Sequence, residues 1–131
     1  MINVIEHAKW KRGFWYLVSP YSKYPGGKEA AFEEVSRLGG QLFSEGVKLY
    51  APIAHGHPLS KFGGVDPDSH DLWMPFDQLF MDVSVGLIIA EMDTWRDSKG
   101  IQIELDYFKA VYRPILYLNT KSLHLAREPH E

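Results

Sequence analysis

The sequence has no cysteine among its 131 residues, so it can form neither disulfide bonds nor thiolate metal sites. It also has no excess of basic residues, because 14 lysines and arginines against 17 aspartates and glutamates give a net charge of −3. That balance argues against a nucleic-acid or anionic-membrane partner. No apolar run is long enough to cross a membrane, and the N-terminal stretch lacks the apolar segment of a signal peptide. We therefore expect a cytoplasmic protein.

What the chain does have is the composition of a globular domain, with 45% hydrophobic and 24% charged residues. Its length suits one domain with a substantial core. We expect a single domain over residues 1–131, with a core at about residues 14–118. The polar tail at residues 119–131 is expected to lie on the surface or at an interface.

Strand and helix patterns alternate along the chain. Short apolar runs predict strands at residues 14–18, 47–53, 85–92 and 113–119. Apolar residues at helical spacing predict helices at residues 26–46, at residues 72–84 and from residue 98 onward. The inward faces of the first two helices are expected to comprise Ala31, Val35, Leu38 and Leu42, and Trp73, Phe76, Leu79, Phe80 and Val83. Residues 54–71, rich in Gly, Pro, Asp and His, are predicted to form a long loop.

This alternation predicts an α/β fold: a flavodoxin-like or Rossmann-like three-layer sandwich with a mostly parallel sheet of four to five strands. In such folds the ligand lies beyond the carboxyl ends of the strands. The segments expected at that edge are Ser19, Pro20 and Tyr21, then His55 and His57, then residues 92–98.

Glu104 is the most informative residue of the last helix. It falls inside an apolar stripe formed by Ile101, Leu105, Phe108 and Val111. The ordinary explanation is a carboxylate at the margin of the stripe that reaches water or a basic partner. Burial of an unpaired carboxylate is costly, however, and this end of the helix faces the ligand edge. We therefore favour a functional role for Glu104.

Ser98 and Gly100 stand at the mouth of the same helix. Ser98 is suited to be its N-cap, and Gly100 could simply be a packing residue. A capped helix mouth with free N–H groups is also an anion site, and a glycine there lets a ligand approach the backbone closely. Both interpretations can hold together.

Two groups of polar residues between the second strand and the third allow more than one interpretation. Asp77 could be a solvated helix residue or could point toward the strand ends. A metal site is conceivable from His55, His57, Asp66, Asp68, His70 and Asp71, but no further zinc motif accompanies them. We expect no metal and no cofactor.

The stretch YPGGKEAAFEE has some likeness to a phosphoribohydrolase motif, but Ala30 and Ala31 replace the residues that its chemistry needs. We interpret it as a turn followed by a helix, with Glu29, Glu33 and Glu34 on the solvated face.

Four segments, YLVSPYS, HGHP, WMPFDQLFMDVSVGLII and WRDSKGIQIE, occur in this order. Together they resemble the nucleoside 2-deoxyribosyltransferase-like superfamily, and especially its branch DUF1937, over roughly residues 16–118. The resemblance implies that Glu104 is a nucleophile attacking C1′ of a nucleoside sugar, that Tyr16 orients it, and that Asp77 contacts the leaving base. It also implies a homo-oligomer, either a dimer or a tetramer.

Ser98 stands where deoxyribosyltransferases carry an aspartate and nucleotide N-hydrolases carry a serine that binds a 5′-phosphate. We therefore expect an N-glycosidase, either a hydrolase or a transferase, acting on a nucleoside 5′-monophosphate or a nucleoside. The residues expected to contact this small-molecule substrate are Ser19, Pro20, Tyr21, His57, Trp73, Asp93, Ser98 and Gly100. The alternative is a non-catalytic nucleotide sensor. The identity of the base, the type of sugar and the choice between hydrolysis and transfer stay open.

Overall fold

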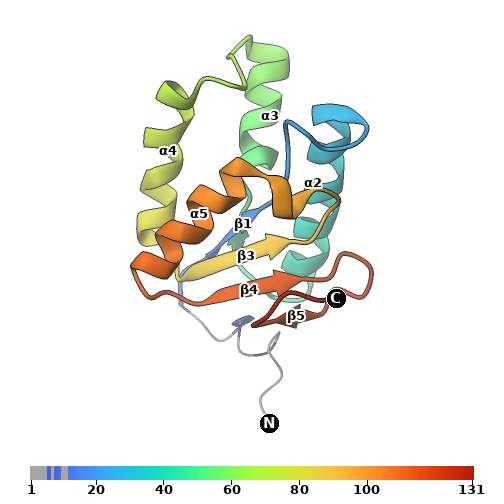
Figure 1. The fold of residues 1–131 in the computed structure, drawn as a ribbon, viewed down its shortest axis with the longest axis vertical. Coiled ribbons are helices and arrows are strands. Elements are labelled where there is room, and N and C mark those ends of the chain that lie inside the picture. Colours follow the sequence, from blue (N-terminus) through green and yellow to red (C-terminus); the bar gives the residue numbers. More distant parts are fainter. Residues whose placement is uncertain (1–5, 7, 10–11) are drawn as a thin grey trace.

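One five-stranded sheet runs through the protein in the order β2-β1-β3-β4-β5 (Figure 1). The computed structural model describes residues 6, 8, 9 and 12–131. The strands are β1 (Trp15–Val18), β2 (Leu49–Tyr50), β3 (Gly86–Ala90), β4 (Ile115–Leu118) and β5 (Leu125–Ala126). From residue 12 onward the helices are α2 (Gly27–Ser44), α3 (Pro52–Gly63), α4 (His70–Val83), the short 3₁₀ helix η1 (Trp95–Asp97) and α5 (Lys99–Ala110).

The strands β1 to β4 are parallel to one another, and β5 pairs antiparallel with β4. Every residue of β1 and β3 is buried, because the sheet is covered on both faces. The order of β2, β1, β3 and β4 is the flavodoxin-like one. The prediction of an α/β three-layer sandwich with a mostly parallel sheet is therefore confirmed.

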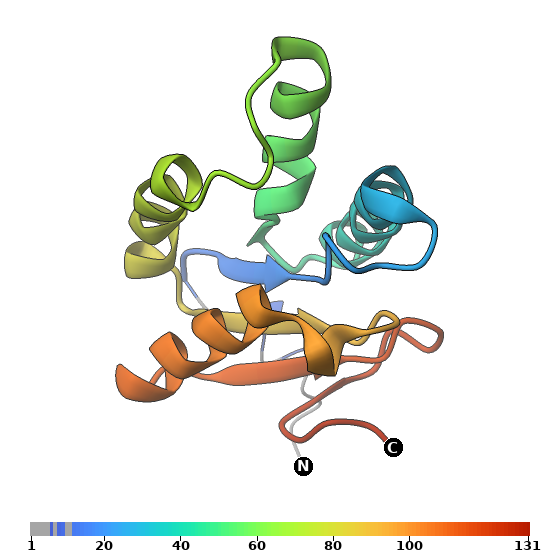
Figure 2. The ribbon, with the colours of Figure 1, turned by 45° about the horizontal axis from the view of Figure 1, so that its top comes forward.

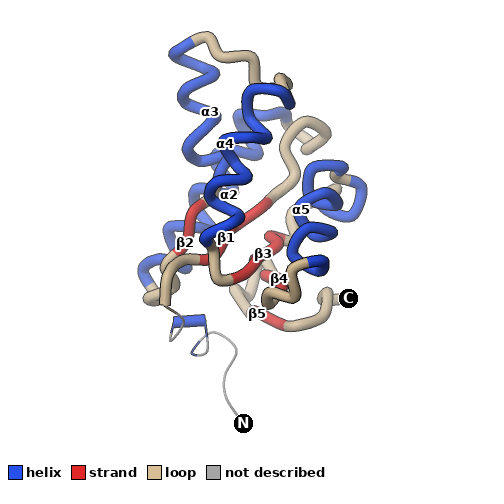
Figure 3. The backbone as a smooth tube through the Cα atoms, turned by 90° about the vertical axis from the view of Figure 1, so that its left-hand side faces the viewer, coloured by secondary structure: helices blue, strands red, loops and turns tan. Residues whose placement is uncertain are grey.

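The two faces of the sheet carry different helices. On one face α2 packs against Trp15, Leu17 and Ile88. Its predicted inward residues are all fully buried: Ala31, Val35, Leu38 and Leu42. The other face is covered by α4 and α5, which contribute Met81, Ile101 and Phe108 to a second apolar cluster. Figure 2 shows α5 lying along β3 and β4, and Figure 3 shows α2 and α5 on opposite sides of the sheet.

The segment between β1 and β3 differs most from the sequence prediction. The strand expected at residues 47–53 spans only Leu49–Tyr50, and the loop expected at residues 54–71 is largely helical. Helix α3 occupies most of it, and only residues 64–69 connect α3 to α4. Figure 1 shows α3 standing beyond the end of the sheet.

The prolines and the glycine that predicted a loop are compatible with helix α3. Pro52 is at the start of α3, where its fixed φ suits the first turn, and Pro58 lies inside the helix. A methyl group at Gly56 would come within 3.3 Å of the Trp73 ring, so the glycine makes room for α4. Contacts between helices thus outweigh the weak local preference for a loop.

Two other expectations need correction. The tail is not merely a polar surface segment, because β5 pairs with β4 and Leu125 is 1% exposed. The inward face of α4 is also narrower than predicted, since Leu79 and Val83 are 64% and 66% exposed. These two residues lie one helical turn apart on the side of α4 that faces away from Met81. The apolar stripe of α5 likewise ends early, as Val111 is exposed.

The turn and helix start predicted for the YPGG stretch are confirmed. Gly26 and Gly27 have φ values of 91° and 92°, and α2 begins at Gly27. Among the described residues, no helix is both long and apolar enough to span a bilayer.

Candidate active site

A pocket of about 340 Å³ opens at the carboxyl edge of the sheet, where the sequence predicted a ligand site. Its walls come from the segment after β1, from α3, from the connection to α4, and from the first turns of α4 and α5. Segments far apart in the sequence meet here because the parallel strands all end at this edge.

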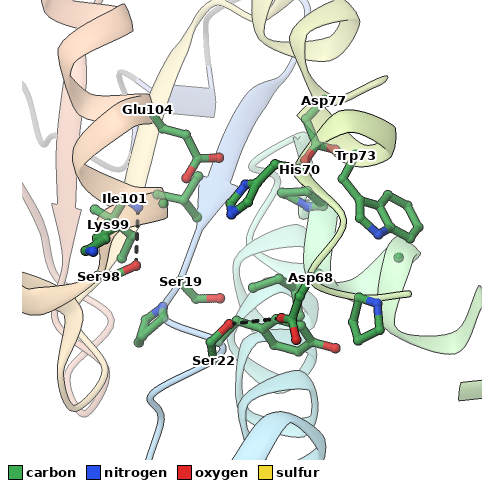
Figure 4. Close-up of a pocket in the computed structure, with 18 of the residues that line it drawn as sticks. Ser19, Ser22, Asp68, His70, Trp73, Asp77, Ser98, Lys99, Ile101 and Glu104 are labelled. Carbon is green, nitrogen blue, oxygen red and sulfur yellow. Dashed lines mark hydrogen bonds between the residues drawn. The ribbon is translucent and has the colours of Figure 1, made fainter. Parts of the chain in front are cut away.

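Two carboxylates dominate one end of the pocket. Figure 4 shows Glu104 of α5 and Asp77 of α4 on opposite sides of the cavity, with their side chains directed toward it. Burial and then the nearby charge of Asp77 raise the pKa of Glu104 to about 8, against a smaller opposing effect of Tyr16, which favours the ionised form. Burial raises the pKa of Asp77 to about 6. At neutral pH the pair therefore holds about one proton, mainly on Glu104.

Two tyrosines lie beneath these carboxylates. Within the described residues, neither the Tyr16 hydroxyl nor the Tyr50 hydroxyl has a partner at full hydrogen-bond geometry, although both oxygen atoms are buried and Tyr16 lies near enough to Glu104 to favour its ionised form. The pKa of Tyr16 is raised by burial and then by the charges of Glu104 and Asp77. Burial and then Asp77 raise the pKa of Tyr50 to about 12. Both side chains thus remain neutral phenols able to donate to a carboxylate that shifts toward them.

The opposite end of the pocket is formed by the mouth of α5. The Ser98 Oγ accepts a hydrogen bond of 3.3 Å from the Ile101 N–H, which confirms Ser98 as the N-cap. Its own proton remains available to an anion. A methyl group at Gly100 would lie 3.8 Å from the Ser98 Oγ, an ordinary contact, so the free protein does not require this glycine.

The hydroxyl groups of Ser19 and Thr94 belong to the same pocket as the N-terminus of α5. The Ser19 Oγ is buried and has no hydrogen-bond partner among the described residues, and Ser19 lines the pocket together with Ser98. The Thr94 Oγ1 is in the same situation. Thr94 has a φ of 71°, which is unfavourable for a β-branched residue and typical of functional sites.

A chain of hydrogen bonds supports the wall formed by α3. The Tyr21 Oη lies 2.6 Å from the His57 Nδ1, and the His57 Nε2 lies 2.5 Å from the Glu29 Oε2. The Lys61 Nζ donates to the other Glu29 oxygen at 2.8 Å. The sequence predicted that Glu29 would simply be solvated on α2, and this is wrong. Glu29 reaches across to α3.

The connection between α3 and α4 is tied down over the pocket. The Asp68 carboxylate accepts from the Lys28 Nζ at 2.9 Å and from the Ser22 Oγ at 3.5 Å. The Trp73 Nε1 donates to the Asp66 carbonyl oxygen at 2.8 Å. Residues 64–69 thereby close one side of the cavity (Figure 4).

Most residues proposed from the sequence meet in this one cavity. Those that line it are Glu104, Asp77, Ser19, Pro20, Tyr21, His57, Trp73, Ser98 and Gly100. Tyr16 is completely buried in β1, behind the pocket wall. Asp93 is exposed on the loop after β3 and is not among the lining residues.

Several residues in or beneath the pocket were not identified as site residues from the sequence. Asp68 and His70 were considered only as parts of a metal cluster, and Tyr50 only as part of a strand. Thr94 belongs to the stretch expected at the ligand edge, but its unusual φ has no sequence signal in a threonine.

The paired histidines argue against a metal site. His55 and His57 are two residues apart on a helix, where they do not share a face, and His55 instead stacks on Phe76. Within the described residues, no three His, Asp or Glu side chains could hold an ion together.

Comparison with known proteins identifies the family. No curated protein matches the chain. The model of a family described as a domain of unknown function, DUF1937, matches residues 13–120, which include the whole pocket. The chain therefore belongs to the DUF1937 family.

Proposed function

We propose that the protein is an N-glycosidase that cleaves the bond between base and sugar in a nucleoside 5′-monophosphate or a nucleoside, in the manner of the nucleoside 2-deoxyribosyltransferase-like superfamily. The observation that carries the proposal is the pair of carboxylates, Glu104 and Asp77, on opposite sides of one pocket. Two carboxyl groups that flank a glycosidic bond are the usual apparatus of enzymes that pass through an oxocarbenium-like transition state.

In this mechanism a Glu104 oxygen forms a bond to C1′ while the bond from C1′ to the base nitrogen breaks. The electron pair of the broken bond stays on the base, which takes a proton from Asp77. A water molecule, or a second base in a transfer reaction, then attacks C1′ and gives its proton to Asp77, and Glu104 is released. Tyr16, behind Glu104, orients the nucleophile.

The protonation of the empty pocket bears on this mechanism. The reaction needs one proton on Asp77, whereas the pKa values of about 8 and about 6 favour the proton on Glu104. The productive distribution, with the proton on Asp77, is therefore the minor one in the empty pocket. Positive charge that develops at C1′ stabilises the ionised Glu104 and shifts this balance in the transition state.

The mouth of α5 supports a 5′-phosphate as the second recognition element. An anion there would meet the free N–H groups of the first turn and the Ser98 hydroxyl proton. Ser19 and Thr94 would supply two hydroxyls that are buried without partners in the described part of the chain. An aspartate at position 98 would repel a phosphate, and serine does not.

The test is base release from a panel of ribo- and deoxyribonucleoside monophosphates. Glu104→Ala should slow the reaction by at least about a thousandfold, because the nucleophile is lost. Asp106→Asn is the matched control, since Asp106 is an exposed carboxylate on the same helix. Activity that survives Glu104→Ala would overturn the mechanism.

The phosphate argument is tested with Gly100→Ala and with nucleosides lacking the phosphate. The added methyl group fits the free protein, so folding should be unaffected while the Michaelis constant for monophosphates rises about tenfold. If nucleosides and monophosphates turn over equally well, the Ser98 argument fails.

One observation favours a second candidate, a non-catalytic nucleotide sensor. A Glu104 that is protonated at neutral pH can donate a hydrogen bond to a sugar hydroxyl without attacking C1′. Thermal shift with the nucleotide panel, followed by chromatography of the ligand, separates the two functions. Nucleotide recovered intact after prolonged incubation supports the sensor.

A homo-oligomer, either a dimer or a tetramer, also stays a proposal. The exposed Leu79 and Val83 support it, because they form an apolar surface on α4, a helix that also lines the pocket. The mass of the protein in solution, measured by light scattering, tests it.

A further inference from the structure

The hydrogen-bond chain from Lys61 to Tyr21 has a defined direction. The Lys61 ammonium can only donate, and the hydrogen bonds from Lys61 and then from His57 hold the pKa of Glu29 below its ordinary value. Glu29 is therefore a carboxylate that only accepts. The His57 Nε2, at 2.5 Å from it, must carry a hydrogen.

The direction continues to the pocket wall. When the His57 imidazole is neutral and carries its hydrogen on Nε2, its Nδ1 has a lone pair that accepts from the Tyr21 O–H across 2.6 Å. Burial, followed by the charges of Asp68 and Glu29, raises the pKa of Tyr21, which keeps its proton. The Tyr21 oxygen then has only lone pairs left to offer a ligand.

Packing holds this arrangement in place. His57 is 8% exposed, its ring stacks on Phe32 with centroids 4.5 Å apart, and the Tyr21 ring meets it edge-on at 5.7 Å. Tyr21 and His57 both line the pocket, whereas Glu29 and Lys61 do not. Glu29 thus acts on a ligand only through His57 and Tyr21.

A second acceptor faces the same region. Asp68 lines the pocket and lies near enough to Tyr21 for its charge to affect the phenol. A carboxylate and a phenol oxygen that both accept are complementary to a group with two hydrogens.

We propose that Tyr21 is a specificity-determining residue that accepts a hydrogen bond from the exocyclic amino group of a nucleobase, and that His57 and Glu29 are positioning residues that fix its direction. This inference rests on the proposed function in one respect. Glu104 and Ser98 both belong to α5, so a sugar and its 5′-phosphate held there would direct the base away from α5, toward the side of the pocket where Figure 4 shows Asp68. Tyr21 lines the same pocket, and the charge of Asp68 acts on its phenol.

The experiment compares ligands that differ by the amino group alone. One pair is AMP and purine riboside 5′-monophosphate, and the other is CMP and its 4-deamino analogue, zebularine 5′-monophosphate. Dissociation constants are measured by calorimetry at about pH 8, where an ordinary imidazole is neutral. The Glu104→Gln background prevents turnover, so that the preference is read from binding alone.

We expect at least one amino-bearing nucleotide to bind about tenfold more tightly than its analogue. Tyr21→Phe should bring that ratio to about one. Glu29→Leu should reduce it several-fold, since the His57 tautomer is then free to change. Glu33→Leu, an exposed carboxylate on the same helix, should leave the ratio unchanged. Circular dichroism and thermal melting show that each variant is folded.

Failure of the inference and failure of the proposed function are distinct results. If nucleotides bind but both pairs bind equally, or if Tyr21→Phe leaves the ratio intact, the role of Tyr21 is overturned and the N-glycosidase proposal stands. A ratio that falls equally in Glu29→Leu and Glu33→Leu would overturn the positioning role of Glu29. If no monophosphate binds, the role of Tyr21 falls together with the 5′-monophosphate form of the proposed function.

Discussion

The two faces of the sheet bury different kinds of side chain. Strand side chains that face α2, such as Trp15, Leu17 and Ile88, are apolar. The face under α4 and α5 buries Tyr16 and, near its carboxyl edge, holds the raised-pKa pair Glu104 and Asp77. Neighbouring residues of one strand therefore serve opposite purposes, because successive side chains of a strand point to opposite faces.

This difference indicates how a small domain can hold a costly site. Within the described residues, buried tyrosine hydroxyls without partners destabilise the folded state, and so, near neutral pH, do carboxyl groups whose pKa values are raised by burial. The fully buried apolar residues of the α2 face offset that cost. We expect mutations on the two faces to separate stability from activity.

The largest effect on stability is expected on the α2 face. Leu38 is fully buried, and Leu38→Ala should lower the free energy of unfolding by about 3 kcal/mol, through lost burial and a residual cavity. Urea denaturation measures the loss, and turnover per folded molecule should be unchanged. A comparable loss of stability from Tyr16→Phe, which removes a hydroxyl without a partner in the described residues, would contradict the division between the faces.

The next effect concerns the pH dependence of turnover by the α4 and α5 face. In the proposed mechanism the nucleophile is lost below pH about 6, where both carboxyl groups are protonated, and the proton donor is lost above pH about 8, where both are ionised. The profile of kcat/KM against pH should be bell-shaped, with an optimum near pH 7. Below pH about 6 and above pH about 8, kcat/KM should fall roughly tenfold per pH unit. Asp77→Asn should remove the bell, and a profile that stays flat from pH 5 to pH 9 in the unmodified protein would exclude the shared proton.

The smallest effect is on stability at the site itself. The pKa of Glu104 rises from 4.5 to about 8 on folding, so its favourable contribution is complete below pH about 4.5 and is lost as the pH rises through about 8. The shift corresponds to about 5 kcal/mol, and because Glu104 is only partly buried we expect about 2 kcal/mol.

Glu104→Gln should therefore stabilise the protein at pH 9 and have little effect at pH 4.5, which thermal denaturation at the two values measures. Equal changes at both pH values would mean that the carboxylate is not desolvated in the folded protein.

Local patterns accounted for three strands of the sheet and for one wall of the pocket. The apolar runs of β1, β3 and β4 and the spacing of Leu38 and Leu42 in α2 carry their own signal, because burial on a strand or helix repeats with a known period. The same reasoning identified Glu104 as a carboxylate in an apolar stripe and Ser98 as the cap of α5. Both belong to one helix, so their relation is a matter of sequence spacing alone.

Helix α3 was missed because its signals are ambiguous. Pro52, Gly56 and Pro58 are all common in loops. What makes this segment helical is contact with other elements, such as the fit of Gly56 under Trp73. The β5 strand was missed for a similar reason, since two residues are too few for a periodic pattern.

The sequence by itself determined that this is an α/β protein with a ligand edge, and that a carboxylate and a capped helix mouth border that edge, because these features depend on composition and on short-range periodicity. Only the tertiary structure decided that Asp77 faces Glu104 and that Glu29 reaches Tyr21 through His57. These partners lie 27 and 28 residues apart for the pairs Asp77–Glu104 and Glu29–His57. Contacts over such separations depend on how the helices pack, which no local pattern encodes.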